Sequence, residues 1–256
     1  MSIAVESFGS GKDIVLVHGW GLHSELWKDI AIKLSTSFRV TLIDLPGHGN
    51  SRPLTSAFTL NSVVDELTMT IPNQSILLGW SLGGMISTQL AIRYPEKISQ
   101  LILVCSTPQF AQGEDWPHAM SLDVLDSFST QLEKDYHTTL QQFLGLQVMG
   151  TSDERGILRE LRIRLKSKPA PGLTALRSGL NILKNENLRP ALHNLDCPML
   201  LIYGQLDRLT PAAVSKDMKK LLPTAECCTI NGAGHAPFIS HPNEFFNIVT
   251  TFIENQ

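Results

Sequence analysis

The sequence lacks the features that would point to nucleic acids or membranes. Its 256 residues carry a formal net charge of -3, with a pI near 6.2, so no global basic surface is available. No apolar run approaches the roughly 20 residues of a membrane helix. The N-terminus shows no basic region followed by a long apolar stretch. We therefore expect a cytoplasmic monomer that binds neither nucleic acid nor membrane.

The sequence is also poor in cysteine and in ligand motifs. The four cysteines are Cys105, Cys197, Cys227 and Cys228. They lack CxxC spacing and lie in or beside apolar runs, which favours buried free thiols over disulfides or metal ligands. Most of the histidines are scattered without metal-ligand spacing, and neither GxxxxGK[ST] nor GxGxxG is present. We expect no metal and no cofactor.

What the sequence does contain is an alternation of short apolar runs with helical patterns. The runs cover residues 14–17, 40–43, 76–78, 101–104 and 199–203, with a weaker one at 226–230. The helical patterns cover residues 60–71, 82–94, 212–222 and 243–254. This alternation predicts an α/β fold in which a mostly parallel central sheet is flanked by helices on both faces.

The alternation breaks once, between about residues 108 and 188, where only helical patterns appear. We interpret this stretch as a helical lid, residues 110–188, inserted between strands of a core formed by residues 1–109 and 189–256. Loops and insertions above strand ends are where binding functions concentrate.

The pentapeptide Gly79-Trp80-Ser81-Leu82-Gly83 matches G-x-S-x-G. A predicted strand precedes it and a predicted helix follows it, which is the context of a nucleophile elbow. The glycines leave room for the tight turn, and the Ser81 hydroxyl would stand at the helix N-terminus, where the helix dipole favours negative charge. A glycine-rich strand-to-helix turn without catalytic function is the simpler alternative.

A serine hydroxyl needs a base to become a nucleophile, and that base needs a carboxylate to orient it. In this architecture the expected chain order is Ser, then Asp or Glu, then His. Asp207 in "YGQLDRLTP" and His235 in "NGAGHAPF" each follow a predicted strand in that order. Asp207 alone could be a helix N-cap and His235 an ordinary loop histidine, but their joint placement with Ser81 favours a catalytic triad.

The oxyanion of a tetrahedral intermediate needs hydrogen-bond donors. The backbone N–H of Leu82 and an N–H from "HGWGLH" are the expected pair, and Trp20 is the candidate for the second. The Trp20 indole would form a wall of the acyl pocket, or it is simply a core aromatic. His18 is expected to order this turn. Asp44 in "DLPGHGNS" follows a different strand from the elbow, so we interpret it as a loop-ordering residue.

The segments "LVHGWGLHSELW", "LGWSLGG", "FLGLQVMG" and "GHAPFISHP" carry a resemblance to a known family. The chain resembles α/β-hydrolases from end to end and, more narrowly, the BioH family of pimeloyl-acyl-carrier-protein methyl ester esterases. The resemblance implies a serine carboxylesterase of biotin biosynthesis. Such an enzyme hydrolyses the methyl ester of a pimeloyl chain on acyl-carrier protein and releases methanol.

The same resemblance implies roles for individual residues. The family's nucleophile, acid and base match Ser81, Asp207 and His235. Its substrate-contacting residues match Trp20, Leu82, His235 and the stretch Phe143, Leu144, Gly145, Leu146 and Gln147. If the stretch is helical, Phe143 and Gln147 face the same way and form an apolar wall with one polar group. A helix that merely covers the core is the alternative.

A cationic stripe is predicted in "DERGILRELRIRLKSKP", residues 153–169. On a helix, Arg155, Arg159, Arg162 and Lys166 share one face. Acyl-carrier proteins are acidic, and the resemblance implies that Arg155 and Arg159, with Arg162 beside them, dock the carrier. Thr138 and Gln142 depart from the family pattern, where further arginines are expected. A solvated helix face explains the stripe equally well.

Three rival interpretations stay open. A general short-chain carboxylesterase and a C–C bond hydrolase would use the same triad, whereas a non-catalytic hydrolase-fold protein would only bind a ligand under the lid. Dehalogenases and epoxide hydrolases place Asp at the elbow, so Ser81 argues against them.

Overall fold

A seven-stranded sheet forms the centre of the computed structural model, which describes residues 3–256. The strand order is β1-β3-β2-β4-β5-β6-β7, and only the β1–β3 pair is antiparallel. The strands are β1 (Val5–Gly9), β2 (Lys12–Val17), β3 (Phe38–Ile43), β4 (Ser75–Trp80), β5 (Ile98–Val104), β6 (Met199–Gly204) and β7 (Glu226–Ile230). The predicted α/β fold with a mostly parallel sheet is confirmed.

Each predicted apolar run lies within a strand, and the runs are apolar because helices cover both faces of the sheet. β4 and β6 are buried along their whole length. The edge strand β1 was not predicted, since four of its five residues are exposed and it has no apolar run. It pairs with β3 through the backbone and through a 2.9 Å hydrogen bond between the hydroxyls of Ser7 and Thr41.

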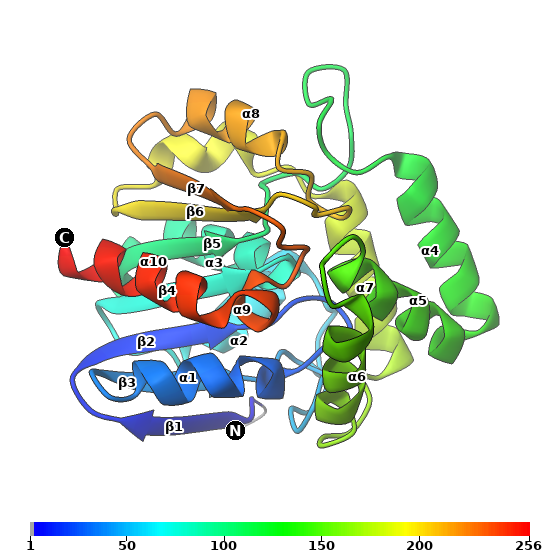
Figure 1. Cartoon of the computed structure of the whole chain (residues 1–256), viewed down its shortest axis with the longest axis horizontal. Coiled ribbons are helices and arrows are strands. Elements are labelled where there is room, and N and C mark those ends of the chain that lie inside the picture. Colours follow the sequence, from blue (N-terminus) through cyan, green and yellow to red (C-terminus); the bar gives the residue numbers. More distant parts are fainter. Residues whose placement is uncertain (1–2) are drawn as a thin grey trace.

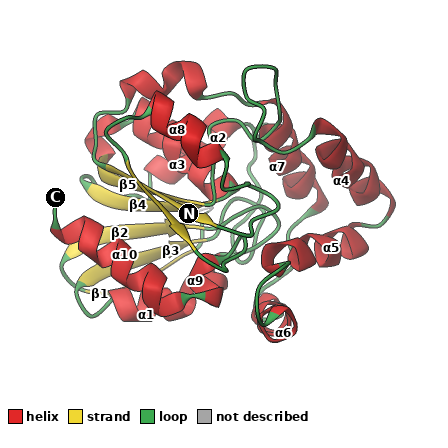
Figure 2. Ribbon diagram, turned by 45° about the horizontal axis from the view of Figure 1, so that its top comes forward, coloured by secondary structure: helices red, strands yellow, loops and turns green. Residues whose placement is uncertain are grey.

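Two helical layers enclose the sheet (Figure 2). One layer holds α1 (Lys28–Leu34), α9 (Pro237–Ser240) and α10 (Pro242–Glu254), and the other holds α2 (Leu60–Thr68), α3 (Leu82–Arg93) and α8 (Val214–Leu221). Three short 3-10 helices lie at Ser24–Trp27, Pro95–Lys97 and Arg189–Asn194. The capping box of Thr59 and Ser62 starts α2, because each side chain satisfies a backbone N–H that the first helical turn leaves free.

Four further helices lie between β5 and β6 in the chain: α4 (Leu122–Lys134), α5 (Tyr136–Val148), α6 (Glu154–Leu165) and α7 (Leu173–Asn185). Figure 1 shows them together at one end of the molecule, beyond the carboxyl ends of the parallel strands. Asp135 and Asp153 cap α5 and α6 by accepting from the backbone N–H groups of Thr138 and Gly156, each at 3.0 Å.

All four cysteines are free, as expected, but only Cys105 is fully buried and the other three are half-buried. Within residues 3–256, no helix has both the length and the apolar character needed to cross a membrane.

Candidate active site

Ser81 lies at the sharp turn between β4 and α3. Its backbone has φ 55° and ψ -121°, a left-handed conformation that costs a non-glycine residue about 1–3 kcal/mol. Hydrogen bonds hold the strained turn: the Ser81 N–H donates to Val104 O at 3.0 Å, and the Ser106 hydroxyl donates to Ser81 O at 2.8 Å. Such a turn lifts the serine side chain clear of the backbone, as the elbow motif predicts.

The glycines of the motif are needed for close approach. A Cβ on Gly79 would lie 2.4 Å from Ser87 Oγ, and one on Gly83 would lie 2.4 Å from the backbone oxygen of His18. Both distances are far below van der Waals contact. Only glycine therefore lets the start of α3 pack against β4 and against the end of β2.

The structure brings Asp207 and His235 together after β6 and β7. His235 Nδ1 lies 2.7 Å from Asp207 Oδ2, and both side chains are buried. The other carboxylate oxygen of Asp207 accepts from the backbone N–H groups of Leu209 and Thr210, at 2.8 and 2.9 Å. A carboxylate held in this way accepts from Nδ1–H, which leaves the lone pair on Nε2.

His235 is also fixed through its backbone. The Trp80 indole donates to His235 O at 2.7 Å, and the His235 N–H donates to Gln147 O, on α5, at 2.9 Å. The residue before Ser81 thus holds the histidine beside the elbow. His235 Nε2 is buried without a hydrogen-bond partner among residues 3–256, so its bond to Ser81 Oγ is not formed in this structure. Catalytic hydrogen bonds of this kind often tighten only when substrate is bound.

The two amides expected to hold the oxyanion lie at the start of α3 and in the loop after β2. The Leu82 N–H opens α3, where no preceding turn offers an acceptor. The Trp20 N–H lies in the loop after β2, and neither amide has an acceptor within the part of the chain that the structure describes. This loop approaches the serine closely, since a Cβ on Gly19 would lie 3.2 Å from Ser81 Cβ.

The Trp20 side chain is fully buried and fixed by the helices beyond the sheet. Its indole donates to Leu176 O, on α7, at 2.8 Å. The ring of Phe143, on α5, packs edge-on against the indole, with 4.8 Å between the ring centroids. Gly179 makes the close approach of α7 possible, because a Cβ there would lie 2.6 Å from the indole. Trp20 therefore connects the loop after β2 to α5 and α7.

The structure divides the predicted substrate-contacting stretch of α5 among three surroundings. Phe143 is buried against Trp20, and Gln147 is buried with its Nε2 donating to Phe143 O at 3.2 Å. Gly145 and Leu146 instead line a groove of about 660 Å³ between α4, α5 and α6. Leu144 lines a separate cavity of about 380 Å³ near Leu22. Leu144 thus faces a different cavity from Gly145 and Leu146, because successive helical residues point in different directions.

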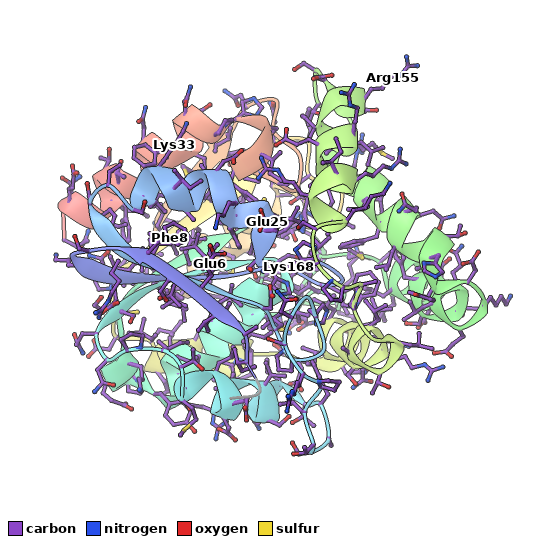
Figure 3. All side chains as sticks on the ribbon, turned by 90° about the horizontal axis from the view of Figure 1, so that it is seen from below. Glu6, Phe8, Glu25, Lys33, Arg155 and Lys168 are labelled. Carbon is purple, nitrogen blue, oxygen red and sulfur yellow. The ribbon has the colours of Figure 1, made fainter. Side chains whose placement is uncertain are left out.

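The predicted cationic stripe lies on α6 and on the residue after it. Arg155, Arg159, Arg162 and Lys166 are all exposed. Figure 3 shows Arg155 projecting away from the molecule at one end of α6. Leu161 is buried on the opposite side of the helix, and Arg162 donates to the Gln141 side chain at 3.0 Å.

Asp44 orders the loop after β3 and does not reach the elbow. It accepts from the backbone N–H groups of Ser24 and Asn50, at 2.9 and 3.0 Å, and pairs with Lys168 Nζ at 3.0 Å. Burial opposes ionisation of this carboxyl. The contact with His18 and the amide hydrogen bonds nevertheless keep the pKa of Asp44 below its ordinary value.

The Sγ of Cys105 lies within 4.8 Å of ligand atoms of Asp207 and His235, so these three residues are a possible metal cluster. Burial, and then the neighbouring carboxylate of Asp207, raise the pKa of the Cys105 thiol well above its ordinary value. A protonated thiol is a poor metal ligand, and the Asp207–His235 hydrogen bond already uses two of the donor atoms.

Sequence reasoning missed three supporting residues: Trp80, Ser106 and Thr210. Ser106 and Trp80 hold the backbones of Ser81 and His235, and the Thr210 hydroxyl donates to Cys105 O at 3.0 Å. A signal was available, because each lies at or soon after the end of a parallel strand, and these ends meet at one edge of the sheet.

Comparisons with known proteins agree with this architecture. The family model described as alpha/beta hydrolase fold matches residues 13–242. An esterase from Exiguobacterium antarcticum superposes with a TM-score of 0.89 at 20% identity, over 98% of this chain and 95% of that one. A bromoperoxidase from Bacillus anthracis gives the same TM-score, identity and coverages, so these likenesses show the fold alone. The fold and the elbow together define an α/β-hydrolase.

Sequence relatives narrow the class further. A pimeloyl-acyl-carrier-protein methyl ester esterase of Aeromonas hydrophila is 41% identical over 99% of this chain and 100% of that protein. The protein of the same name in Sodalis glossinidius is 40% identical over 98% of both chains. The chain belongs to the family of pimeloyl-acyl-carrier-protein methyl ester esterases.

Proposed function

We propose that this protein is a serine carboxylesterase that hydrolyses the methyl ester of pimeloyl-acyl-carrier protein, releasing methanol and pimeloyl-acyl-carrier protein for biotin biosynthesis. The full-length relationship to esterases of that name supports the substrate. The pairing of His235 with Asp207, beside the strained turn at Ser81, supports the chemistry and is the single observation that carries it.

The first step is acyl transfer to the serine. Ser81 Oγ attacks the ester carbonyl carbon while His235 Nε2 takes the hydroxyl proton. Asp207 stabilises the imidazolium through Nδ1–H, and the backbone N–H groups of Trp20 and Leu82 stabilise the oxyanion. The C–O bond to the methoxy group then breaks, and His235 returns the proton to methanol.

The second step returns the enzyme to its starting state. A water molecule gives a proton to His235 and attacks the acyl carbon. The bond from that carbon to Ser81 Oγ breaks, and the serine recovers its proton. The products are the free carboxylic acid and the intact hydroxyl, so the chemistry requires no external oxidant, reductant or metal.

We assign the helices of residues 110–188 the role of a lid. They contact the site directly, because Gln147 O accepts from the His235 N–H and Leu176 O accepts from the Trp20 indole. Burial of Ser81, at 4% exposure, fits a pocket closed by these helices. Opening of the lid would then control access of the acyl chain.

The exposed stripe of Arg155, Arg159 and Arg162 is the proposed docking surface for the acyl-carrier protein. Its positive charge complements an acidic partner and would speed encounter more than it strengthens the final complex. Thr138 and Gln142 are exposed neutral residues of α5, so docking here depends on α6.

The test compares methyl pimeloyl-acyl-carrier protein with free short-chain methyl esters and p-nitrophenyl esters. The proposal predicts a kcat/KM for the carrier-bound ester well above those for free esters, with methanol and the free acid as products. Equal rates on all esters would instead favour a general carboxylesterase. If no ester is cleaved and a fluorophosphonate does not label Ser81, the protein is a non-catalytic binder.

A further inference from the structure

We propose that His18 is a positioning residue that aims the Trp20 N–H at the developing oxyanion. The inference rests on the proposed esterase function, and it adds an effect on the reaction to the expected role of His18 in ordering the turn. His18 is fully buried at the end of β2, in the turn that leads to Trp20. It touches neither Ser81 nor His235 through a hydrogen bond.

The partners of the imidazole fix its protonation. The Leu45 N–H donates to His18 Nε2 at 2.9 Å, so Nε2 must be the unprotonated nitrogen. The proton of the neutral ring therefore lies on Nδ1, which donates to Gly19 O at 2.8 Å. Burial, together with the nearby His48, lowers the pKa of His18 to about 3, so this neutral tautomer persists over the working range of an esterase.

The geometry of the peptide bond transmits this hydrogen bond to the reaction. Gly19 O and the Trp20 N–H belong to one planar trans peptide unit, in which the oxygen and the hydrogen point in opposite directions. Holding the oxygen toward the His18 ring therefore turns the N–H away from that ring. Gly19 lies against Ser81, since a Cβ added to Gly19 would be 3.2 Å from Ser81 Cβ.

The same peptide is restrained from its other end. The Trp20 indole donates to Leu176 O at 2.8 Å, so rotation of the loop would break hydrogen bonds on both sides. An oxyanion donor is effective when it is oriented before the charge develops, because no reorganisation is then needed in the transition state. His18 supplies this orientation for one of the two donors.

Two substitutions separate the two hydrogen bonds of the imidazole. In His18→Asn, the side-chain amide nitrogen can replace Nδ1 as donor to Gly19 O, but the Leu45 N–H loses its acceptor. In His18→Gln, the longer side chain can place its oxygen near the position of Nε2 and accept from Leu45, but the bond to Gly19 O is lost. His18→Ala removes both bonds.

We expect kcat to depend on the hydrogen bond from His18 to Gly19 O. We expect Tm to depend on the hydrogen bond from the Leu45 N–H to His18. Loss of a whole oxyanion donor costs about two to three powers of ten, so a misaimed one should lower kcat in His18→Gln by about tenfold to a hundredfold. KM should change little, because the ground-state carbonyl depends less on this donor. His18→Asn should recover most of the kcat that His18→Ala loses, but with a lower Tm than His18→Gln.

A transition-state analogue provides a readout that a purely structural role would not move. A short-chain trifluoromethyl ketone forms a hemiketal with Ser81 Oγ, and its oxyanion would occupy the same site. Its inhibition constant should rise in His18→Gln by the factor by which kcat/KM falls, whereas binding of the carboxylic acid product should not change. The turnover rate of each variant is divided by the concentration of active sites, measured as the amount of protein that a fluorophosphonate labels at completion. Unfolded protein is therefore not counted.

His48→Asn is the matched control, since it removes a second buried histidine, whose ring centroid is 5.3 Å from that of His18. His48 contacts Pro46 O and not Gly19. Its substitution should therefore lower Tm and leave the inhibition constant of the trifluoromethyl ketone unchanged. Equal kcat losses in His18→Asn and His18→Gln, or a His18→Gln enzyme within twofold of the wild type, would overturn the inference. Absence of esterase activity in the wild type would instead refute the proposed function.

Discussion

The site at the strand ends and the helical region of residues 110–188 hold their polar side chains in different ways. Asp207 and His235 are buried, and several hydrogen bonds fix their positions. Arg155 and Arg159 are exposed and have no hydrogen-bond partner within residues 3–256. Loops at the ends of buried strands thus carry the groups that must meet within a fraction of an ångström, whereas solvated helices carry the groups that need only supply charge.

The two regions are nevertheless joined by a few buried contacts. Lys168, in the loop after α6, pairs with Asp44 at the end of β3 and donates to Ser24 Oγ at 2.7 Å. Figure 3 shows Lys168 where the helical region meets the core. Variants of the strand-end site, of the helices and of this junction therefore test whether the two regions differ in this way.

The largest expected effect belongs to the strand-end site. Ser81→Ala should lower kcat on p-nitrophenyl esters by about four to six powers of ten, because the nucleophile is removed while the oxyanion donors stay. Tm should not fall, since the serine side chain makes no hydrogen bond that holds the fold. Initial rates and calorimetry check both points. A folded variant with substantial activity would contradict the proposed nucleophile.

The junction should give the next largest effect. Lys168→Met leaves the Asp44 carboxylate buried without its cation, which should destabilise the protein by about 3 kcal/mol. Lys184, paired with Asp126 on the exposed surface, offers a control in which Lys184→Met costs about 0–1 kcal/mol. Urea midpoints measure both. The double variant Asp44→Asn/Lys168→Met should recover most of the stability that Lys168→Met loses. Equal losses of stability in Lys168→Met and Lys184→Met would count against a buried ion pair.

Much of the strand-end site could be predicted from sequence because its determinants are local. The turn at Ser81 requires glycines at fixed spacing, the strand before Asp207 carries a continuous apolar run, and the strand before His235 carries a weaker one. The parallel topology then places all three residues at one edge of the sheet. Strand order, not contact between neighbours in the chain, decides their proximity.

Other features could not be predicted, for physical reasons that differ between them. β1 is an exposed edge strand, and backbone pairing with β3 defines it more than an apolar pattern does. The division of the α5 stretch among three surroundings depends on how α4 and α6 pack around it. The anchoring of Trp20 by Leu176 joins residues 156 positions apart, and no local signal marks such a contact.

On the helical region, a charge reversal should affect only carrier-bound substrates. Arg155→Glu/Arg159→Glu should lower kcat/KM for methyl pimeloyl-acyl-carrier protein by about tenfold at low salt, and by less at high salt, because exposed charges are screened. The rate on a p-nitrophenyl ester serves as the reference. Arg177→Glu/Lys184→Glu, on α7 and outside the stripe, makes the same total charge change as a control. Equal losses in the double variant and the control would remove the stripe from the docking surface.

The smallest expected effect contrasts buried and exposed histidines across the two regions. Burial lowers the pKa of His48 to about 4 and that of His18 to about 3, whereas the unfolded chain protonates both near 6.5. Between these values the unfolded state binds more protons, so stability falls as pH decreases from about 6.5 toward 4. Each histidine contributes a slope of at most about 1.4 kcal/mol per pH unit.

His48→Asn should therefore flatten the dependence of the urea midpoint on pH below 6.5 and leave it unchanged above pH 7. His137→Asn is the control, since it replaces a histidine at an exposed position of α5 and removes no buried ring. Parallel profiles for the wild type and His48→Asn would mean that the folded protein admits a proton at His48 as readily as the unfolded chain does. The strand-end region would then be more open to water than the burial of its histidines indicates.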